Sequence, residues 1–295
     1  NAFHYEQQLD AGFGLYQRLG MHSVKSGYVA DAGGAQVAGP DGRPTRAWHE
    51  GQAMAQHHLR VVQTAAKYQV AVNAHEPFKD TGLRRTYPNM ISREGARGME
   101  YNAWGQPGNP PEHEPNLVFT RLLAGPMDFT PGIFGMETRS PDGVATTWAK
   151  QLALYVVIYS PVQMAADLLV NYEANPGPFQ FIKDVPVDWA ETRVLNGEVG
   201  DYVTIARKDR ASDVWALGSI TDEYPRSLNV ALDFLDAGRT YRAEIYRDGE
   251  GANWQTAREA IIIEQRDVTS DDRLTLDLAP GGGQAIRFVP LGKGR

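Results

Sequence analysis

Glu76, Glu94 and Glu100 lie close together in the sequence, in a stretch from residue 72 to residue 104 that reads VNAHEPFKDTGLRRTYPNMISREGARGMEYNAW. Their spacing does not place the three carboxylates on one helix, so strand ends and loops must bring them together. Several carboxylates in one site repel each other unless a shared proton or a hard metal ion compensates their charge. Such a group can supply the acid and the base that cleave a glycosidic bond, with a calcium ion taking up the remaining charge.

The alternative for each glutamate is a solvated surface charge, since most glutamates are exposed. Glu76 departs from this expectation because it follows the apolar run QVAVNA at residues 69–74, which makes its surroundings crowded. The two interpretations differ in what they require of the chain. A three-carboxylate site requires strands that end near one another, whereas surface charges require no particular fold.

Other side chains in the same stretch could contact a ligand. Arg84 could orient a carboxylate or bind a hydroxyl group, and its alternative is a solvated loop arginine. Tyr87, Tyr101 and Trp104 could form a platform for a sugar ring or could pack structurally. His75 suggests a zinc ligand, but the chain has no HExxH motif, which argues against a zinc site.

The elements that must position these side chains alternate between strand and helix over the first part of the chain. Such alternation predicts parallel β/α architecture, in which functional groups lie at the carboxyl ends of the strands. Glu76, Asp128 and Asp167 fall at such ends. The expected elements are a first helix ending at Gly20, a strand at 22–30, an exposed loop at 32–44, a helix at 48–68, a strand at 69–74, a helix at 116–125, a strand end and loop at 126–132, a helix at 146–160 and a strand at 161–167.

The pattern changes after Pro176. Short alternating segments are separated by Asp, Gly and Asn turns, which predicts an antiparallel β-sandwich. We therefore predict a partial catalytic (β/α)8 barrel at residues 1–176 and a β-sandwich at residues 177–295. The sandwich could brace the barrel or bind carbohydrate, and an exposed row of Trp and Tyr on one sheet would favour binding. Trp189, Trp215 and Trp254 are too far apart in the sequence to decide.

Composition limits the classes of function. The chain has 295 residues, 42% of them hydrophobic, which is enough for a substantial core. Its formal net charge of −7 and scattered basic residues argue against nucleic acid or an anionic membrane as the main partner. With no cysteine, any metal must be bound through oxygen or imidazole. No apolar run approaches the roughly 20 residues that span a bilayer.

The stretch at 72–104, together with FTRLLAGPMDFTPGIF and LALYVVIYSPVQMAAD after it, resembles glycoside hydrolase family 97, a family of α-glucosidases and α-galactosidases. The resemblance runs nearly end to end, from YQRLGMHSVKSGYV through FQFIKDVPVDW to LNGEVGDYVTIAR, and motifs of this length are specific. It implies an N-terminal β-supersandwich, a central (β/α)8 barrel and a C-terminal β-sandwich. This chain would then be the second half of the barrel and the last domain, N-terminally truncated.

The resemblance also implies a role for each glutamate. The Glu of AHE matches Glu76, a calcium ligand and the general base towards the attacking water. The Glu of REG matches Glu94, a calcium ligand, and the Glu of EYNAW matches Glu100, the general acid close to the calcium ion. As the residues that contact the substrate, we predict His75, Arg84, Tyr87, Tyr101 and Asp128.

A local feature distinguishes the two branches of the family. In the retaining branch, the strand that reads VKSGYV here ends with a nucleophilic Asp in a pattern close to KxD. This chain has Lys25, Ser26 and Gly27 instead, so no carboxylate stands at that position. We therefore predict inversion, in which water attacks directly, and an α-glucosidase acting on α-linked oligosaccharides in the periplasm or outside the cell. An α-galactosidase of the same family and a non-catalytic carbohydrate-binding or structural fragment are the alternatives.

The second base and one calcium ligand of the inverting branch have no secure match in this chain, and we expect both upstream of Asn1. We therefore expect the purified 295-residue chain to be inactive or nearly so and to bind Ca²⁺ weakly. Robust hydrolysis of p-nitrophenyl α-glucoside by this chain would contradict the expectation.

Overall fold

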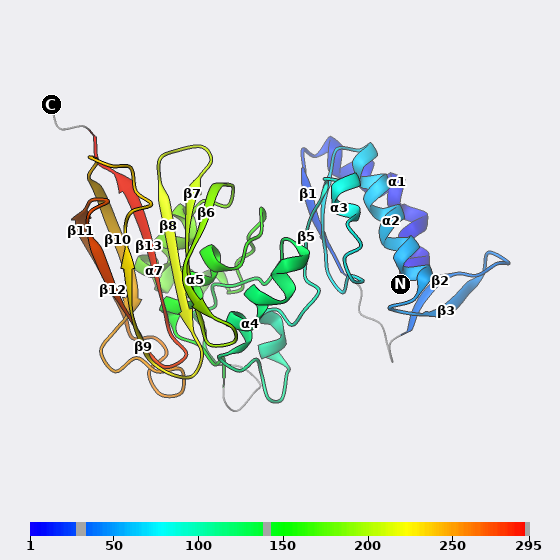
Figure 1. Cartoon of the computed structure of the whole chain (residues 1–295). Coiled ribbons are helices and arrows are strands. Elements are labelled where there is room, and N and C mark those ends of the chain that lie inside the picture. The colour runs from blue at the N-terminus through cyan, green and yellow to red at the C-terminus, as the bar shows by residue number, and fades with distance from the viewer. Residues whose placement is uncertain (28–33, 138–142, 293–295) are drawn as a thin grey trace. The chain divides into compact units, whose positions relative to one another are not determined.

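The computed structural model describes residues 1–27, 34–137 and 143–292. It divides into two compact units (Figure 1). The first unit contains Asn1–Ala96 and Pro126–Asp128, and the second contains Arg97–Gly125 and Phe129–Arg295. Within the part of the chain that is described, no helix has both the length and the apolar character needed to cross a lipid bilayer.

The first unit is a small parallel sheet with helices on one face (Figure 1). Its strands pair in the order β1-β4-β5, and both pairings are parallel. A single parallel bridge between Arg93 and Met127 adds the segment at residues 127–128 beside β5. The elements are α1 (Ala2–Arg18), β1 (Ser23–Ser26), β2 (Gly34–Ala38), β3 (Pro44–Trp48), α2 (Gln52–Lys67), β4 (Ala71–Ala74), α3 (Leu83–Thr86) and β5 (Met90–Arg93).

The helices of the first unit are explained by their apolar faces. In α2, buried Met54, Val61 and Ala65 recur at helical spacing. In the core, α2 packs with α1 against Val72 and Met90 of the sheet. The predicted helix at 48–68 and strand at 69–74 are thus confirmed in type and place. The β/α alternation is confirmed here as well, whereas closure of these strands into a barrel stays a prediction.

One expectation for the first unit is wrong. Residues 34–48, placed within and just after an exposed loop, form an antiparallel hairpin of β2 and β3. Ala35 and Val37 are buried on one face of β2 and pack with Met54. Residues 39–43 make the turn, where Gly42 has φ of 76°, whereas Gly34 and Pro44 are the first residues of β2 and β3. The turn residues dominate the composition of this segment and mask the short strands beside them.

The second unit is built on a six-stranded antiparallel sheet with strand order β11-β10-β13-β8-β7-β6 (Figure 1). A two-stranded ribbon of β9 and β12 packs with this sheet around one hydrophobic core. This core includes Trp215, Tyr241 and Phe288. The strands are β6 (Trp189–Glu198), β7 (Tyr202–Asp209), β8 (Trp215–Thr221), β9 (Arg226–Ala231), β10 (Tyr241–Asp248), β11 (Ile261–Val268), β12 (Arg273–Leu278) and β13 (Gly283–Pro290). The predicted β-rich C-terminal region is therefore confirmed.

Helices precede this sheet in the second unit. They are η2 (Met99–Ala103), α4 (His113–Phe119), η3 (Arg121–Ala124), α5 (Trp148–Val157), α6 (Leu169–Ala174) and α7 (Pro176–Asp184). Every residue of α5 is buried, and the helix contacts β7, β8, β10 and β13. The predicted helix at 146–160 is thus confirmed in type, and its burial on all sides explains why most of its residues are apolar.

The strand expected at residues 161–167 is wrong, since these residues form no strand. Their polar groups bond to loops instead: the Ala166 amide donates to the Pro131 carbonyl, and Gln163 donates to the Ile158 carbonyl. Asp167 accepts from the amides of Phe134 and Gly135 at 2.6 and 2.7 Å. A short apolar run does not by itself supply the partner that a strand requires.

Gly218 in β8 allows the close approach of α5. A Cβ atom at this position would lie 2.6 Å from the Ala153 carbonyl oxygen and 2.9 Å from the Val156 Cβ atom. We expect Gly218→Ala to lower the free energy of unfolding by about 1–3 kcal/mol, because the helix must move away from the sheet. Urea unfolding measures this change.

Gly12→Ala is the matched control. Gly12 lies in α1, and nothing lies within 4 Å of the Cβ atom that alanine would add. We expect this variant to unfold at an unchanged or higher urea concentration, because alanine favours the helix by up to about 1 kcal/mol. Equal stability of the two variants would contradict this account of the packing.

Candidate functional site

The parallel sheet of the first unit has an apolar face and a polar face. Val24 and Val72 point towards the helices and join their core, whereas Lys25 and Asn73, which pair with each other in the register of β1 and β4, point the other way. The same alternation continues past the end of β4 to His75. Polar side chains therefore collect on the face opposite the helices, at the carboxyl ends of the strands.

Asp128 is the centre of this polar group. Its side chain is 1% exposed, and its Oδ2 atom accepts hydrogen bonds from Asn73 Nδ2 at 2.6 Å and His75 Nε2 at 2.7 Å. The Lys25 ammonium group lies 3.3 Å from the same oxygen. The Asp128 amide donates to the Arg93 carbonyl at 2.9 Å, which continues the ladder beyond β5. A single carboxylate thus joins side chains from β1, from β4 and from the residue that follows β4.

Electrostatics favour the ionised form of Asp128. Burial alone raises the pKa of its carboxyl group, because removal from water disfavours the charge. The hydrogen bond from His75, the charge of Lys25 and the hydrogen bond from Asn73 outweigh burial and hold the pKa at about 2. Asp128 is therefore a fixed negative charge at neutral pH.

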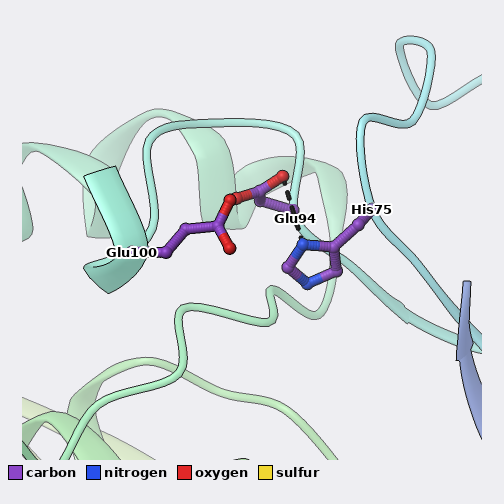
Figure 2. A group of neighbouring side chains, drawn as sticks. All are labelled: His75, Glu94 and Glu100. Carbon is purple, nitrogen blue, oxygen red and sulfur yellow. Dashed lines mark ion pairs between the residues drawn. The ribbon is translucent and has the colours of Figure 1, made fainter. Parts of the chain in front are cut away.

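His75 lies between Asp128 and Glu94, and Figure 2 shows its ring beside the Glu94 carboxylate. Its ring is buried, and its backbone amide donates to the Ser26 carbonyl at 2.7 Å. Nε2 contacts Asp128, and Nδ1 lies 3.4 Å from Glu94 Oε2. The ring is thus held from the backbone and from one nitrogen, and its other nitrogen faces the carboxylate of Glu94.

Glu76 and Glu94 follow adjacent parallel strands, β4 and β5. The Glu94 amide donates to the Ala74 carbonyl at 2.9 Å, and the Glu76 amide lies 3.4 Å from Glu94 Oε2. Glu76 has φ of 43°, a left-handed conformation that is uncommon for a residue with a side chain. Such strain is typical of functional sites. The first unit therefore brings Glu76, Glu94, His75 and Asp128 close together, and their roles in catalysis and binding stay a prediction.

Gly27 lies next to Glu76 at the end of β1. A Cβ atom at position 27 would lie 2.8 Å from Glu76 Oε2 and 2.8 Å from the His75 Cβ atom. Contacts this short require a neighbour to move. The side chain of Glu76 therefore uses space that a side chain at position 27 would need.

Arg84 and Tyr87 have partners elsewhere in the first unit. Arg84 forms an ion pair with Asp80, whose side chain is almost fully buried, and Arg93 lies 3.2 Å from the same carboxylate. The Tyr87 hydroxyl accepts from Gln63 of α2 at 2.7 Å, on the helix side of the sheet. These contacts do not link Arg84 or Tyr87 to His75 or Asp128. That Arg84 and Tyr87 contact a substrate stays a prediction.

Glu100 and Tyr101 belong to the second unit, in η2. Glu100 is exposed. The Tyr101 ring packs edge-on against Trp104 with 4.6 Å between centroids, and the Arg97 guanidinium lies 4.3 Å from the Tyr101 ring centre. Trp104 itself is 62% exposed. These contacts support a local aromatic cluster, and its role towards a sugar stays a prediction.

The aromatic row that would favour a carbohydrate-binding module does not form from the tryptophans considered. Trp189 and Trp215 are buried in the second unit, and Trp254 is half-buried. Trp215 packs in the core against Phe234. Trp189 and Trp215 therefore pack inside the second unit and form no exposed row, which favours the structural interpretation of this region.

Sequence reasoning missed Lys25 and Asn73 as partners of Asp128. It also missed Asp80 as the partner of Arg84 and Arg93. A signal for Asn73 was present, because a polar residue inside the apolar run VAVNA must find a hydrogen-bond partner when buried. Lys25 stands in a strand pattern at the position that faces Asn73 across the pair. Nothing in the sequence pattern singles out Asp80 from other loop aspartates.

Comparison with known proteins gives two matches to one family. The model described as glycoside hydrolase 97 matches residues 1–96, and the model described as glycosyl-hydrolase 97 C-terminal, oligomerisation, matches residues 188–289. A retaining alpha-galactosidase from Bacteroides thetaiotaomicron is 35% identical over 80% of this chain and 36% of its own length. A probable retaining alpha-galactosidase from Streptomyces bingchenggensis is 29% identical over 76% of this chain and 32% of its own.

Solved structures are more similar. A glycoside hydrolase family 97 enzyme from Pseudoalteromonas sp. strain K8, in complex with acarbose, is 51% identical and superposes with a TM-score of 0.94. A variant of that enzyme in complex with panose gives a TM-score of 0.93 at the same identity. Both alignments cover 99% of this chain and 46% of that one. The chain belongs to glycoside hydrolase family 97, and it spans less than half the length of these relatives.

The charge of Asp128 makes a testable contribution to stability. Its pKa is about 2 in the folded protein and near 4 in an unfolded chain. The stabilisation is therefore fully present above about pH 4 and is lost as the pH falls through about 2. We expect Asp128→Asn to lower the free energy of unfolding by about 2 kcal/mol at pH 7, and the deficit to shrink near pH 2. Urea unfolding of both proteins at several pH values measures it, and a deficit independent of pH would contradict the ionic account.

Proposed function

We propose that this chain is the part of a calcium-dependent α-glucosidase of glycoside hydrolase family 97 that carries the general acid Glu100 and the general base Glu76. The enzyme cleaves α-glucosidic bonds of oligosaccharides with inversion at the anomeric carbon. The observation that carries the proposal is the arrangement of Gly27, Glu76 and Glu94 at the ends of three adjacent parallel strands.

Gly27 supports inversion. It stands where the pattern of retaining relatives places a nucleophilic Asp, and a side chain there would collide with Glu76. A nucleophile at position 27 and a base at Glu76 in its present position therefore exclude each other sterically. A chain with Gly27 and Glu76 is suited to direct attack by water, for which the two working carboxyl groups must be roughly 6.5–9.5 Å apart.

Glu76, Glu94 and Glu100 are the proposed calcium ligands. The donor set fits, because Ca²⁺ prefers carboxylate oxygens and the contact of the Glu76 amide with Glu94 Oε2 puts two of these glutamates side by side. Bound at this site, calcium would supply positive charge that offsets carboxylate repulsion and polarises water. His75 is a less suitable ligand for so hard a cation than the oxygens beside it.

The roles of the two catalytic glutamates follow from the reaction. Glu100 protonates the glycosidic oxygen as the bond to the leaving sugar breaks, so it must carry its proton in the ground state. Glu76 accepts a proton from the attacking water on the opposite face of the sugar ring. The proposal assigns contacts with the sugar to Arg84, Tyr87 and Tyr101.

The choice of glucose rests on the more similar relatives. The Pseudoalteromonas enzyme, at 51% identity, was solved with acarbose and with panose, and panose is an α-linked glucose trisaccharide. The curated relatives named retaining alpha-galactosidases are 35% and 29% identical. Their names favour α-galactoside hydrolysis with retention as the second candidate. We further propose a periplasmic or secreted location, on the family resemblance.

The anomer of the first product separates the two candidates. A polypeptide of the relatives' full length that contains this chain is given p-nitrophenyl α-glucoside and α-galactoside, and ¹H NMR follows the sugar released. We expect β-glucose first, with the rate falling at least tenfold after calcium is removed with a chelator and returning on its addition. An α-anomer as first product, or faster galactoside cleavage, would support the second candidate instead.

Substitution of Gly27 tests the steric argument. We expect Gly27→Asp and Gly27→Ala each to lower kcat at least tenfold, because either Cβ atom displaces Glu76, and we expect neither to change the product anomer. The alanine variant is the control that adds bulk without a carboxylate. A wild-type rate for Gly27→Ala would show that position 27 does not constrain Glu76.

A further inference from the structure

We propose that Asn109 is a positioning residue for Glu100, because it bonds to the short turn that carries this glutamate on both sides of it. The inference rests on the proposed function for the role of Glu100 as general acid. It adds to that role a residue that lies outside the motifs of the sequence. Glu100, Asn109 and the contacts that join them belong to the second unit.

The turn that carries Glu100 needs support from its neighbours. It is η2, a 3₁₀-helix of five residues, and its N-terminal cap is Gly98, which has no side chain to bond the free amides. Helices of this kind are short because their hydrogen bonds have poor geometry. The Tyr101 amide, for example, donates to the Gly98 carbonyl at 3.3 Å. The side chain of Glu100 is exposed, so packing around it does not fix its direction.

Asn109 supplies this support through two hydrogen bonds. Its Nδ2 atom donates to the Gly98 carbonyl at 3.0 Å, two residues before Glu100. Its backbone amide donates to Asn102 Oδ1 at 2.8 Å, two residues after Glu100. Asn109 and Asn102 are 3% and 2% exposed, and burial strengthens such bonds. These two bonds, called the Asn109 brace, fix the backbone on either side of Glu100 and therefore the direction in which its side chain leaves the chain.

Two further contacts hold the start of the same segment. The Met99 amide donates to the Phe129 carbonyl at 2.8 Å, and His113 Nε2 lies 2.8 Å from the Arg97 carbonyl oxygen. Both contacts involve residues before Glu100 in the sequence. The bond from Asn109 to Asn102 adds a fixed point after it, so the turn is held at both ends.

Asn109 is fixed in turn by the core of the second unit. Lys150 lies in α5 and is fully buried, and its Nζ atom donates to the Pro111 carbonyl at 2.7 Å and to the Thr221 carbonyl at 3.0 Å. The same ammonium group forms an ion pair with the buried carboxylate of Glu114 at 3.0 Å. Hydrogen bonds from a charged donor are stronger than neutral ones. The loop that follows Asn109 is therefore tied to α5 and to the end of β8.

Gly108 leaves the space that the Asn109 brace needs. A Cβ atom at position 108 would lie 2.9 Å from Asn102 Oδ1, the atom that accepts from the Asn109 amide. A contact this short requires a neighbour to move. Gly108→Ala therefore disturbs the brace by adding bulk, whereas Asn109→Ala removes one of its donors.

The position of Glu100 matters for one kind of leaving group. A sugar leaves as an alcohol, so its oxygen must take a proton from an acid within hydrogen-bond reach. A misplacement of about 1 Å can cost on the order of 100-fold in rate. Fluoride leaves as a weakly basic anion and depends much less on an acid. Loss of position at Glu100 should therefore slow the first kind of substrate selectively.

Two substrates with the same sugar and different leaving groups test the brace. A polypeptide of the relatives' full length that contains this chain is given maltose and α-glucosyl fluoride at saturating calcium. We expect Asn109→Ala and Gly108→Ala each to lower kcat on maltose by about tenfold or more, and kcat on the fluoride by less than about threefold. Partial unfolding would lower both rates by the same factor. Equal losses on the two substrates, or no loss on either, would overturn the proposal. If Asn109→Ala fails to fold, Gly108→Ala decides by the same comparison.

Asn116→Ala is the matched control. It removes the same donor from the same region of the second unit, since Asn116 Nδ2 donates to the Glu112 carbonyl at 3.0 Å. This bond joins two residues of the α4 segment and does not involve the turn of Glu100. We expect both rates to stay within about twofold of wild type. A selective loss on maltose in this control would show that the comparison does not report on the brace, and would overturn the assignment to Asn109.

Glu100→Gln separates the inference from the function on which it rests. If it lowers kcat on maltose about 100-fold more than kcat on the fluoride, the role of Glu100 as general acid is supported. Equal losses in Asn109→Ala would then overturn the brace alone. If Glu100→Gln lowers both rates equally, the assignment of Glu100 as the acid fails, and the positioning role of Asn109 fails with it.

Discussion

The buried carboxylate of Asp128 is the interaction on which the first unit depends. It collects Lys25, Asn73 and His75 from separate segments, and these partners offset the cost of burying its charge. The strands are short, so few backbone hydrogen bonds join them. The contacts of the Asp128 carboxylate therefore also help to hold the strands together. The stability of this unit and the geometry of its candidate site therefore both depend on the Asp128 carboxylate.

Strand alternation explains how four-residue strands serve two purposes. Val72 and Ala74 of β4 pack in the core with the helices, while Asn73 and His75 face the opposite side and bond to Asp128. A shift of one residue in register would bury the polar groups among the helices and expose the apolar ones. The hydrogen bonds of Asp128 on one face of β4 and the apolar core on the other face therefore require the same register.

The predictable parts of this protein are those set by local patterns. Helical spacing located α2, and alternation with turns located strands of the large antiparallel sheet. The hairpin β2–β3 was missed because its turn residues dominated the composition, and the strand at 161–167 was wrong because a strand needs a partner. For the site, strand ends and family motifs indicated Glu76 and Glu94, whereas the contacts of Lys25 and Asp80 depend on tertiary packing that no local pattern encodes.

The central claim is that Glu76 and Glu94 bind a calcium ion through their oxygens, next to the buried contact of His75 with Asp128. A crystal structure of the protein grown with calcium chloride, with anomalous scattering to locate the cation, tests it most directly. The account predicts a calcium ion about 2.3–2.6 Å from carboxylate oxygens of both glutamates, with His75 Nε2 still bonded to Asp128. A cation bound to His75, or no cation at these glutamates, would contradict it.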